Sequence, residues 1–373
     1  MLSLVIALSL AVPPEPLPTS MIVTGFTNAV AWAPDGKALF AGGDDGFIRE
    51  LDPATGRERR KLYPTREQRE KAKAARPSRT DVATRYTLHD VEALAVTPDG
   101  KQLVSAGDDE MIRVWDLATG EAVHSYFWGP YALKRFEGGI NCMALSADGK
   151  RVVAGGWDTT VRVFDLEAGT GTILRGHERG VTDVAISPDG TLIASTGNDG
   201  TAKIWRFDGT LVTTLVGHDA VVDSVAWSPD GKRLATGGDG LSVWTRGLGS
   251  PTGVDGNLVT SNPSVKVLVL WDTTTWKPVF DATFDVDEVT ALTYSRDGKD
   301  LYAGIFDNGK GHAILRIDTK KNTVVGRFIA GASNIATVAF NGRRIASNDG
   351  GDVVVLDAKS GRELARWSAP AER

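Results

Sequence analysis

The chain has 373 residues, a formal net charge of −5 and one cysteine, Cys142. One cysteine excludes an internal disulfide framework and any cysteine-based zinc site, and the mildly acidic balance excludes a chain-wide attraction to nucleic acid. Glycine supplies 42 residues, which indicates many tight turns, while a hydrophobic content of 42% is sufficient for a large buried core.

The N-terminal segment is apolar from Met1 to Val12 and proline-rich up to Pro18. The apolar run is too short for a membrane-spanning helix, which needs about 20 residues, but it fits the apolar region of a secretory signal, about 7–15 residues long. Residues 1–19 are therefore interpreted as a signal peptide of an exported, periplasmic or extracellular protein. The alternatives are a disordered Pro-rich tail on a cytoplasmic protein, or a first strand. No other stretch reaches membrane-spanning length.

One short motif, typically Ser-Pro-Asp-Gly, recurs along the rest of the chain. Its acidic positions, with Asn in the last copy, are separated by 64, 49, 41, 41, 67 and 44 residues. The shortest spacing defines a repeat of about 40 residues, and the longer ones indicate insertions. The copies are Ala33–Gly36, Thr97–Gly100, Ser146–Gly149, Ser187–Gly190, Ser228–Gly231, Ser295–Gly298 and the degenerate Phe340–Gly342.

Each copy lies between two runs of alternating polarity, as Val184–Ile186 and Leu192–Ser195 show. Asp-Gly between such runs is typical of a hairpin turn, because glycine adopts positive φ without steric cost. Two further strands follow in each repeat. Four short antiparallel strands in about 40 residues predict one propeller blade. Residues 20–373 are therefore predicted to form one all-β domain, a seven-bladed β-propeller of four-stranded antiparallel blades. For the last blade, the outer strand is expected at 362–367 rather than at 21–23.

These repeats resemble the WD-repeat β-propeller family over roughly residues 20–373, and the family acts as an interaction platform. The resemblance implies a hydrogen-bonded chain of His177, Ser195, Asp199 and Trp205 in the fourth blade. A hydrolase is not predicted from these residues, since Ser195 lies in mid-strand rather than on a turn that exposes a nucleophile. The matching motifs are Gly176-His177, Gly217-His218, Val114-Trp115-Asp116 and Leu270-Trp271-Asp272.

Other blades keep only some residues of this hydrogen-bonded chain. The second keeps Ser105, Asp109 and Trp115, the third has Asp158 with Phe164, and the first has Asp45 with Leu51.

Three insertions interrupt the repeat. The first, at about 62–87, lies in a basic stretch in which residues 57–85 contain 11 Lys/Arg and 4 Asp/Glu. It is read either as a solvated charged helix or as a basic patch for an acidic partner, a phosphate-rich surface or nucleic acid. The second contains aromatic and basic residues over 126–136, which form either a binding hot spot or a small core covering the blade edge. The third is Gly/Ser-rich, at about 239–264, and precedes a strand placed at 265–271.

The insertions are predicted to share one face of the ring. If the strands of a blade are called a to d from the axis outward, the d–a and b–c connections lie on one face. The first two insertions are d–a connections and the third is a b–c connection, so this face is the predicted working surface. The residues predicted to contact a partner there are Trp128, Tyr131, Lys134, Arg135, Arg66, Arg69, Lys71 and Lys73.

The sequence thus predicts a non-enzymatic WD-repeat-like scaffold that binds a protein or peptide, with no cofactor. None of the five histidines has metal-ligand spacing, and the predicted axial funnel offers no clear cluster of histidines and carboxylates. A propeller enzyme with a metal or quinone in that funnel remains an alternative. Nucleic-acid binding through the basic insertion is another.

Overall fold

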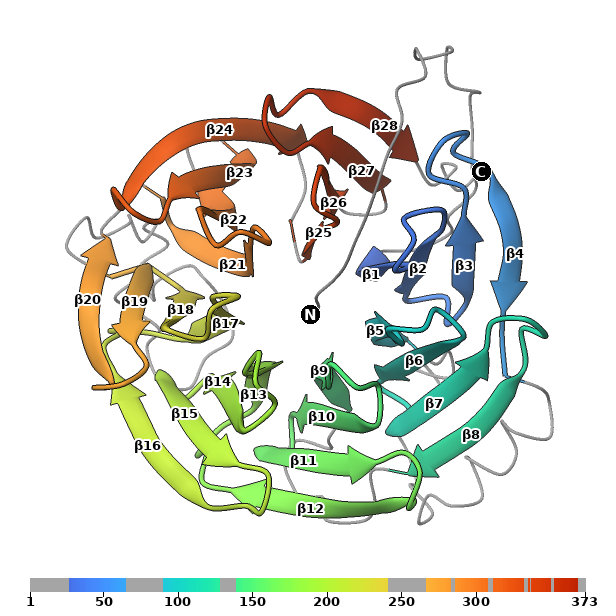
Figure 1. Cartoon of the computed structure of the whole chain (residues 1–373), viewed down its shortest axis with the longest axis horizontal. Coiled ribbons are helices and arrows are strands. Elements are labelled where there is room, and N and C mark those ends of the chain that lie inside the picture. The colour runs from blue at the N-terminus through green and yellow to red at the C-terminus, as the bar shows by residue number, and fades with distance from the viewer. Residues whose placement is uncertain are drawn as a thin grey trace, which may run out of the picture.

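The computed structural model describes residues 27–64, 90–127, 139–240, 266–282, 286–307, 311–331, 335, 337–349 and 352–367. Their strands form seven antiparallel sheets of four strands each, arranged around a central axis (Figure 1). The predicted seven-bladed propeller is therefore confirmed. Residues 1–19 and most of the two larger insertions lie outside the described residues, so the signal-peptide interpretation stays a prediction.

Blades 1 to 4 follow one another in chain order. Their strands are β1 (Thr27–Trp32), β2 (Leu39–Gly43), β3 (Ile48–Leu51) and β4 (Glu58–Leu62); β5 (Val91–Val96), β6 (Gln102–Gly107), β7 (Met111–Asp116) and β8 (Ala122–Phe127); β9 (Ile140–Leu145), β10 (Arg151–Gly156), β11 (Thr160–Asp165) and β12 (Thr170–Arg175); and β13 (Val181–Ile186), β14 (Leu192–Gly197), β15 (Thr201–Arg206) and β16 (Leu211–Val216).

Blades 5 to 7 complete the ring. Their strands are β17 (Val222–Trp227), β18 (Arg233–Gly238), β19 (Leu268–Asp272) and β20 (Lys277–Ala282); β21 (Glu288–Tyr294), β22 (Asp300–Asp307), β23 (Gly311–Asp318) and β24 (Thr323–Gly331); and β25 (Val338–Phe340), β26 (Arg344–Asp349), β27 (Asp352–Asp357) and β28 (Glu363–Trp367).

The recurring Ser-Pro-Asp-Gly motif forms the tight turn between the first two strands of a blade. In blade 4 the Ser187 hydroxyl donates to Asp189 (2.6 Å) and accepts from the Leu192 amide (2.9 Å). Gly190 takes a φ of 70°, where a side chain would be strained. The motif therefore recurs because each hairpin needs the same turn. Its serine and aspartate side chains form hydrogen bonds within that turn.

The core consists of the surfaces between blades. The structure contains seven hydrophobic clusters, and each is shared by two neighbouring blades, so every one of the seven interfaces has its own cluster. Strand β2 is buried at all five positions, whereas the outer strand β12 is mostly exposed. The middle strands are buried on both faces because a blade lies on each side of them.

The ring closes between blades 7 and 1. Strand β28 pairs with β27, so the last blade is built entirely from C-terminal strands, as predicted. Trp32 and Trp367 belong to the cluster that joins the two blades. The Asn348 amide also donates to the Thr27 carbonyl at 2.8 Å, which links the ends of the described chain.

The antiparallel order fixes where each connection lies. We call the face carrying the d–a and b–c connections the insertion face, and the opposite face, with the a–b and c–d turns, the turn face. The two d–a insertions join β4 to β5 and β8 to β9, and the b–c insertion joins β18 to β19. All three therefore leave and re-enter the ring on the insertion face, although the strand after the third begins at Leu268 rather than at residue 265.

Candidate functional site on the insertion face

The eight predicted partner-binding residues lie outside the described residues. They are Trp128, Tyr131, Lys134, Arg135, Arg66, Arg69, Lys71 and Lys73, and their role stays a prediction. The site is therefore built from the described side chains on the same face, which belong to the inner strands and the b–c turns.

Blade 4 contains the polar chain that the family resemblance implies. His177 contacts Asp199 through Nδ1 and Ser195 through Nε2, both at 2.8 Å, and Trp205 Nε1 donates to Ser195 Oγ at 2.8 Å. If the Asp199 carboxylate accepts from Nδ1–H, then Nε2 accepts the Ser195 hydroxyl proton. Ser195 is fully buried, so this serine joins strands and no substrate can reach it.

The Asp199 carboxylate is held ionised by its partners. Burial alone would raise its pKa, but hydrogen bonds from His177, Thr201 and the Glu178 amide hold the pKa well below the ordinary value of 3.8. The same carboxylate thereby joins the turn before β13 to the turn before β15. The Asp199 carboxylate therefore holds these two connections together.

Blade 5 keeps a shorter version of the chain. His218 Nε2 contacts Thr236 Oγ1 at 2.7 Å, Trp271 Nε1 donates to the same oxygen at 2.9 Å, and His218 Nδ1 contacts the Lys266 carbonyl at 3.0 Å. The Lys266 carbonyl thus takes the place that the Asp199 carboxylate has in blade 4. Burial lowers the pKa of His218 to about 4.

Blades 1 to 3 hold the turn aspartate with an arginine instead. Arg162 pairs with Asp158 at 2.7 Å, Arg113 pairs with Asp109 at 2.5 Å, and Arg49 pairs with Asp45. Each arginine is at most 5% exposed. Sequence reasoning missed these pairs, although the signal was present: an arginine stands four residues after the aspartate in all three blades.

The inner strands of blades 1 to 6 each contain one residue that the strand pairing skips. At each of these bulges a polar side chain is directed out of the strand pairing, and several of these side chains reach the next blade. Asn141, for example, donates to the Val181 carbonyl at 3.1 Å, and Thr182 and Thr290 contact the following blade in the same way. The skipped residues are Asn28, Glu92, Asn141, Thr182, Asp223 and Thr290.

Carboxylates gather where blades 1 and 2 meet at the axis. Ligand oxygens of Asp90, Glu92 and Asp108 all lie within 4.8 Å of one another. Asn28 joins this group to blade 1, since its amide donates to Glu92 at 3.1 Å and to Asp44 at 2.9 Å. Burial, followed by repulsion from Asp108, Asp90 and Asp44, raises the pKa of Glu92 to about 8.

Sequence reasoning did not single out these three carboxylates, since its expectation for the axial funnel concerned a joint cluster of histidines and carboxylates. Asp90 and Glu92 flank the first residue of β5, and Asp108 lies in the b–c turn of blade 2, so only the folded blade brings the three together. Three carboxylate oxygens can supply part of the shell of a divalent cation. No histidine belongs to this group within the described chain.

A second acidic group lies between blades 5 and 6. Asp239, at the end of β18, forms a backbone bridge with Glu288 at the start of β21. Burial and repulsion from Asp239 and Asp287 raise the pKa of Glu288 to about 7, and burial together with Glu288 raises the pKa of Asp223 well above its usual range. The inner rim of the insertion face is therefore acidic on both sides of the axis.

One exposed aromatic side chain lies on the same face, where blades 3 and 4 meet. Trp157, in the b–c turn of blade 3, is 42% exposed and lies over Gly180 of blade 4, where a Cβ would come within 2.7 Å of the ring. Its amide donates to the Gly139 carbonyl at 3.2 Å, and Gly139 also packs against the Asp108 side chain. Sequence reasoning missed Trp157, although blades 1, 2 and 4 carry Asp or Asn at this position, at 44, 108 and 198.

Comparison with known families agrees with this architecture. The model of the WD domain, G-beta repeat, matches residues 21–50, 81–116, 131–165, 170–206 and 209–241. Together with the seven-bladed ring, these five matches show that the chain belongs to the WD-repeat β-propeller family. Propellers of this family are generally non-enzymatic scaffolds that bind proteins or peptides. No curated protein matched the chain.

The search for membrane-crossing helices was negative. Within the described ranges, no helix has the length and apolar character needed to cross a bilayer.

Replacing Ser195 tests whether the His177 chain is structural. Ser195→Ala leaves two buried donors or acceptors without their partner, so we expect the free energy of unfolding to fall by about 1–3 kcal/mol in urea denaturation. Ser125→Ala, on the exposed outer strand β8, is the control and should change it by less than about 0.5 kcal/mol. Unchanged stability, or labelling of Ser195 by a serine-directed phosphonate, would contradict the structural role.

The raised pKa of Glu92 predicts a pH-dependent stability. The folded-state pKa of about 8 lies above the ordinary 4.5, so unfolding releases a proton and wild-type stability falls as pH rises from 4.5 to 8. Glu92→Gln keeps an acceptor for Asn28 but cannot ionise. We expect urea denaturation to show its advantage over wild type growing by up to about 1.4 kcal/mol per pH unit across this window.

The control for this pH series is Glu167→Gln, which removes an exposed carboxylate on the turn face. Its difference from wild type should stay constant with pH. A Glu92→Gln difference that is equally flat would show that neither burial nor the neighbouring carboxylates raise the pKa of Glu92 in the folded protein.

Proposed function

We propose that this propeller is a non-enzymatic scaffold that binds a protein or peptide partner through its insertion face. The observation that carries the proposal is that the exposed Trp157 and the carboxylates of Asp90, Glu92 and Asp108 lie on the face from which all three insertions leave. Loops on a rigid ring are the usual place for recognition. Tryptophan is also among the residues that dominate binding energy at protein interfaces.

The acidic inner rim of the insertion face favours a partner of a particular charge. Burial, followed by the nearby carboxylates of Asp108 and Asp90, raises the pKa of Glu92 to about 8, so this side chain is largely protonated at neutral pH. An arginine or lysine of the partner would favour the ionised carboxylate, and an arginine side chain can in addition stack on an exposed indole such as that of Trp157. The partner segment seated at the axis is therefore expected to be basic.

Two other functions are less well supported by the described residues. Nucleic acid would bring phosphates against an acidic rim, which is electrostatically unfavourable. An axial enzyme would need the carboxylate cluster to hold a metal, and this is the one specific observation in its favour. Stoichiometric divalent metal in the purified protein would therefore favour the enzyme over the scaffold.

Replacing Trp157 tests the proposed surface. The probe is a short fluorescein-labelled arginine-rich peptide, and binding is followed by fluorescence anisotropy at physiological salt. We expect Trp157→Ala to weaken binding about tenfold or more, because a hot-spot aromatic contributes about 2 kcal/mol. The melting temperature should be unchanged, since the side chain is 42% exposed.

A matched control is Val279→Ala, which removes an apolar side chain that is 50% exposed on the outer strand of blade 5. It should bind the peptide like wild type. Asp108→Asn should weaken binding and flatten its salt dependence. The proposal fails if Trp157→Ala binds as tightly as wild type, or if it unfolds and so proves to be a core residue.

A further inference from the structure

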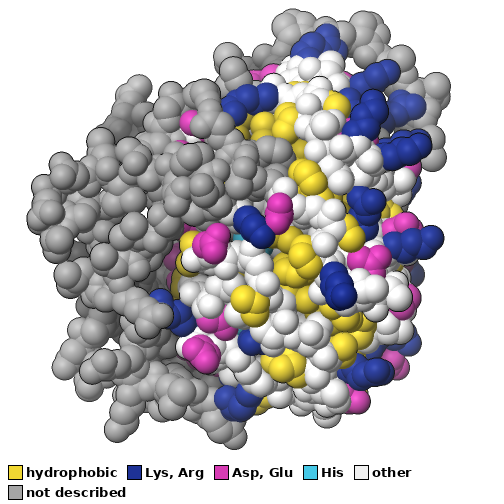
Figure 2. All heavy atoms as spheres, turned by 90° about the vertical axis from the view of Figure 1, so that its left-hand side faces the viewer, with side chains coloured by type: hydrophobic (Ala, Val, Ile, Leu, Met, Phe, Trp, Pro, Cys, Tyr) yellow, Lys and Arg dark blue, Asp and Glu magenta, His cyan; other side chains and the backbone are white. Residues whose placement is uncertain are grey.

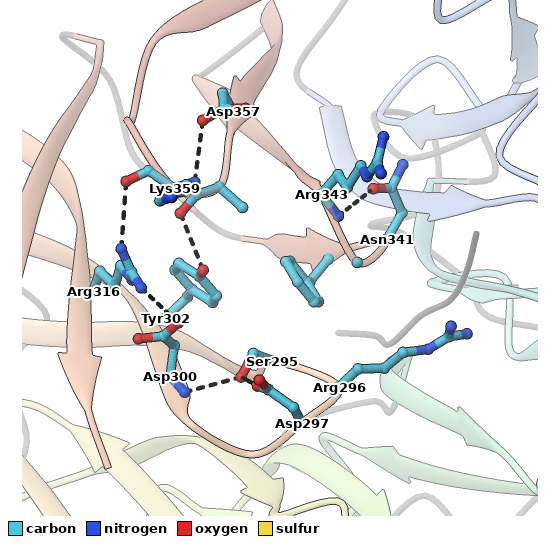
Figure 3. A pocket seen from close by; sticks show the side chains of 13 residues that line it. Ser295, Arg296, Asp297, Asp300, Tyr302, Arg316, Asn341, Arg343, Asp357 and Lys359 are labelled. Carbon is cyan, nitrogen blue, oxygen red and sulfur yellow. Dashed lines mark hydrogen bonds and ion pairs between the residues drawn. The ribbon is translucent and has the colours of Figure 1, made fainter. Parts of the chain in front are cut away.

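A cavity of about 730 Å³ opens on the turn face, opposite the insertion face. It lies between blades 6 and 7, and Figure 3 shows the turn that carries Arg296 on one side and the turns that carry Arg343 and Lys359 on the other. Its volume falls within the range of about 300–1,000 Å³ typical of ligand sites. No residue of this face is among those predicted from the sequence to contact a partner.

The floor of the cavity is rigid. The rings of Tyr302 and Phe340 stack with centroids 5.4 Å apart, and these residues are only 2% and 6% exposed. The Tyr302 hydroxyl donates to the Ala358 carbonyl at 3.1 Å, which joins blade 6 to blade 7. Because Tyr302 and Phe340 are nearly covered, a ligand would meet mainly the side chains of the surrounding turns.

The carboxylates of the rim already have partners. Asp300 pairs with Arg316 at 2.9 Å, and Asp297 pairs with Lys299 at 2.7 Å. Asp357 accepts hydrogen bonds from the amide and the hydroxyl of Ser360 at 2.8 Å and 2.6 Å. Asp297 and Asp300 are therefore neutralised by cations, whereas Asp357 keeps its charge and accepts hydrogen bonds from its own turn.

Three cations of the rim lack such partners. No side-chain hydrogen bond or ion pair joins Arg296, Arg343 or Lys359 to any residue that the structure describes. Burial lowers the pKa of the Arg296 guanidinium, the direction expected of a cation that loses water without gaining an anion. The cavity thus keeps an uncompensated positive charge.

The surrounding turns reinforce this charge. In blades 6 and 7 the a–b and c–d turns contain eight Lys/Arg and four Asp/Glu, whereas those of blades 1 to 5 contain nine and twelve. The view onto the outer strands β16, β20 and β24 shows Lys and Arg side chains gathered along one side of the described surface (Figure 2). Among the described turns of this face, the cavity therefore lies in a positively charged sector.

We propose that this cavity binds an acidic segment of a second protein, whose carboxylates contact Arg296 and Arg343. A guanidinium matches a carboxylate in a two-bond geometry, and no competing anion must be displaced. The occupant is not a segment of this chain outside the described ranges, because none of those segments contains two adjacent acidic residues. The site lies on the face opposite the proposed Trp157 surface and does not depend on it.

The test uses the full chain and a short fluorescein-labelled glutamate-rich peptide, followed by anisotropy at physiological salt. Wild type should bind the peptide, and the double variant Arg296→Ala/Arg343→Ala should bind it at least tenfold more weakly. The matched control is Lys320→Ala/Lys321→Ala, which removes the same charge from an exposed turn of blade 6 outside the cavity. It should weaken binding less than threefold.

Three results would overturn the proposal: no binding of the glutamate-rich peptide, equal losses in the two double variants, or displacement of the peptide by inorganic phosphate or a single-stranded oligonucleotide at comparable concentration. Trp157→Ala should bind the glutamate-rich peptide like wild type. This variant therefore separates the failure of one face from the failure of the other.

Discussion

Apolar packing between neighbouring blades is the interaction on which the rest of the structure depends. A four-stranded sheet has two apolar faces and cannot cover either by itself. Here every interface has its own cluster, including the one that joins the last blade to the first. The ring is thus closed by the same apolar packing that joins all other neighbouring blades. This closure holds seven sets of turns at fixed positions on two faces.

The architecture could be predicted from the sequence because its signals are local. The Ser-Pro-Asp-Gly turn is explained within a few residues, as Ser187 and Asp189 show. The blade 4 chain was inferred from family resemblance, and His177, Ser195, Asp199 and Trp205 do form it. What could not be predicted depends on the folded ring: the carboxylates at the axis come from an inner strand and a b–c turn, and the cavity comes from two blades.

The two faces of the ring differ in charge. The insertion face has carboxylates at its inner rim, where burial and mutual repulsion raise the pKa of Glu92 and Glu288. The turn face has uncompensated arginines at the blade 6–7 cavity. Under the two proposals above, these opposite charges let the ring hold a basic segment on one face and an acidic segment on the other.

The mutual dependence of the blades is tested most directly by hydrogen exchange of the intact protein and of Val355→Ala. Val355 is fully buried in the cluster between blades 7 and 1, so the substitution leaves a cavity at the closing interface. If the ring is one cooperative unit, the most protected amides of blade 4, across the axis, should exchange faster by the same factor as those of blade 7. Faster exchange confined to blades 7 and 1 would contradict the account.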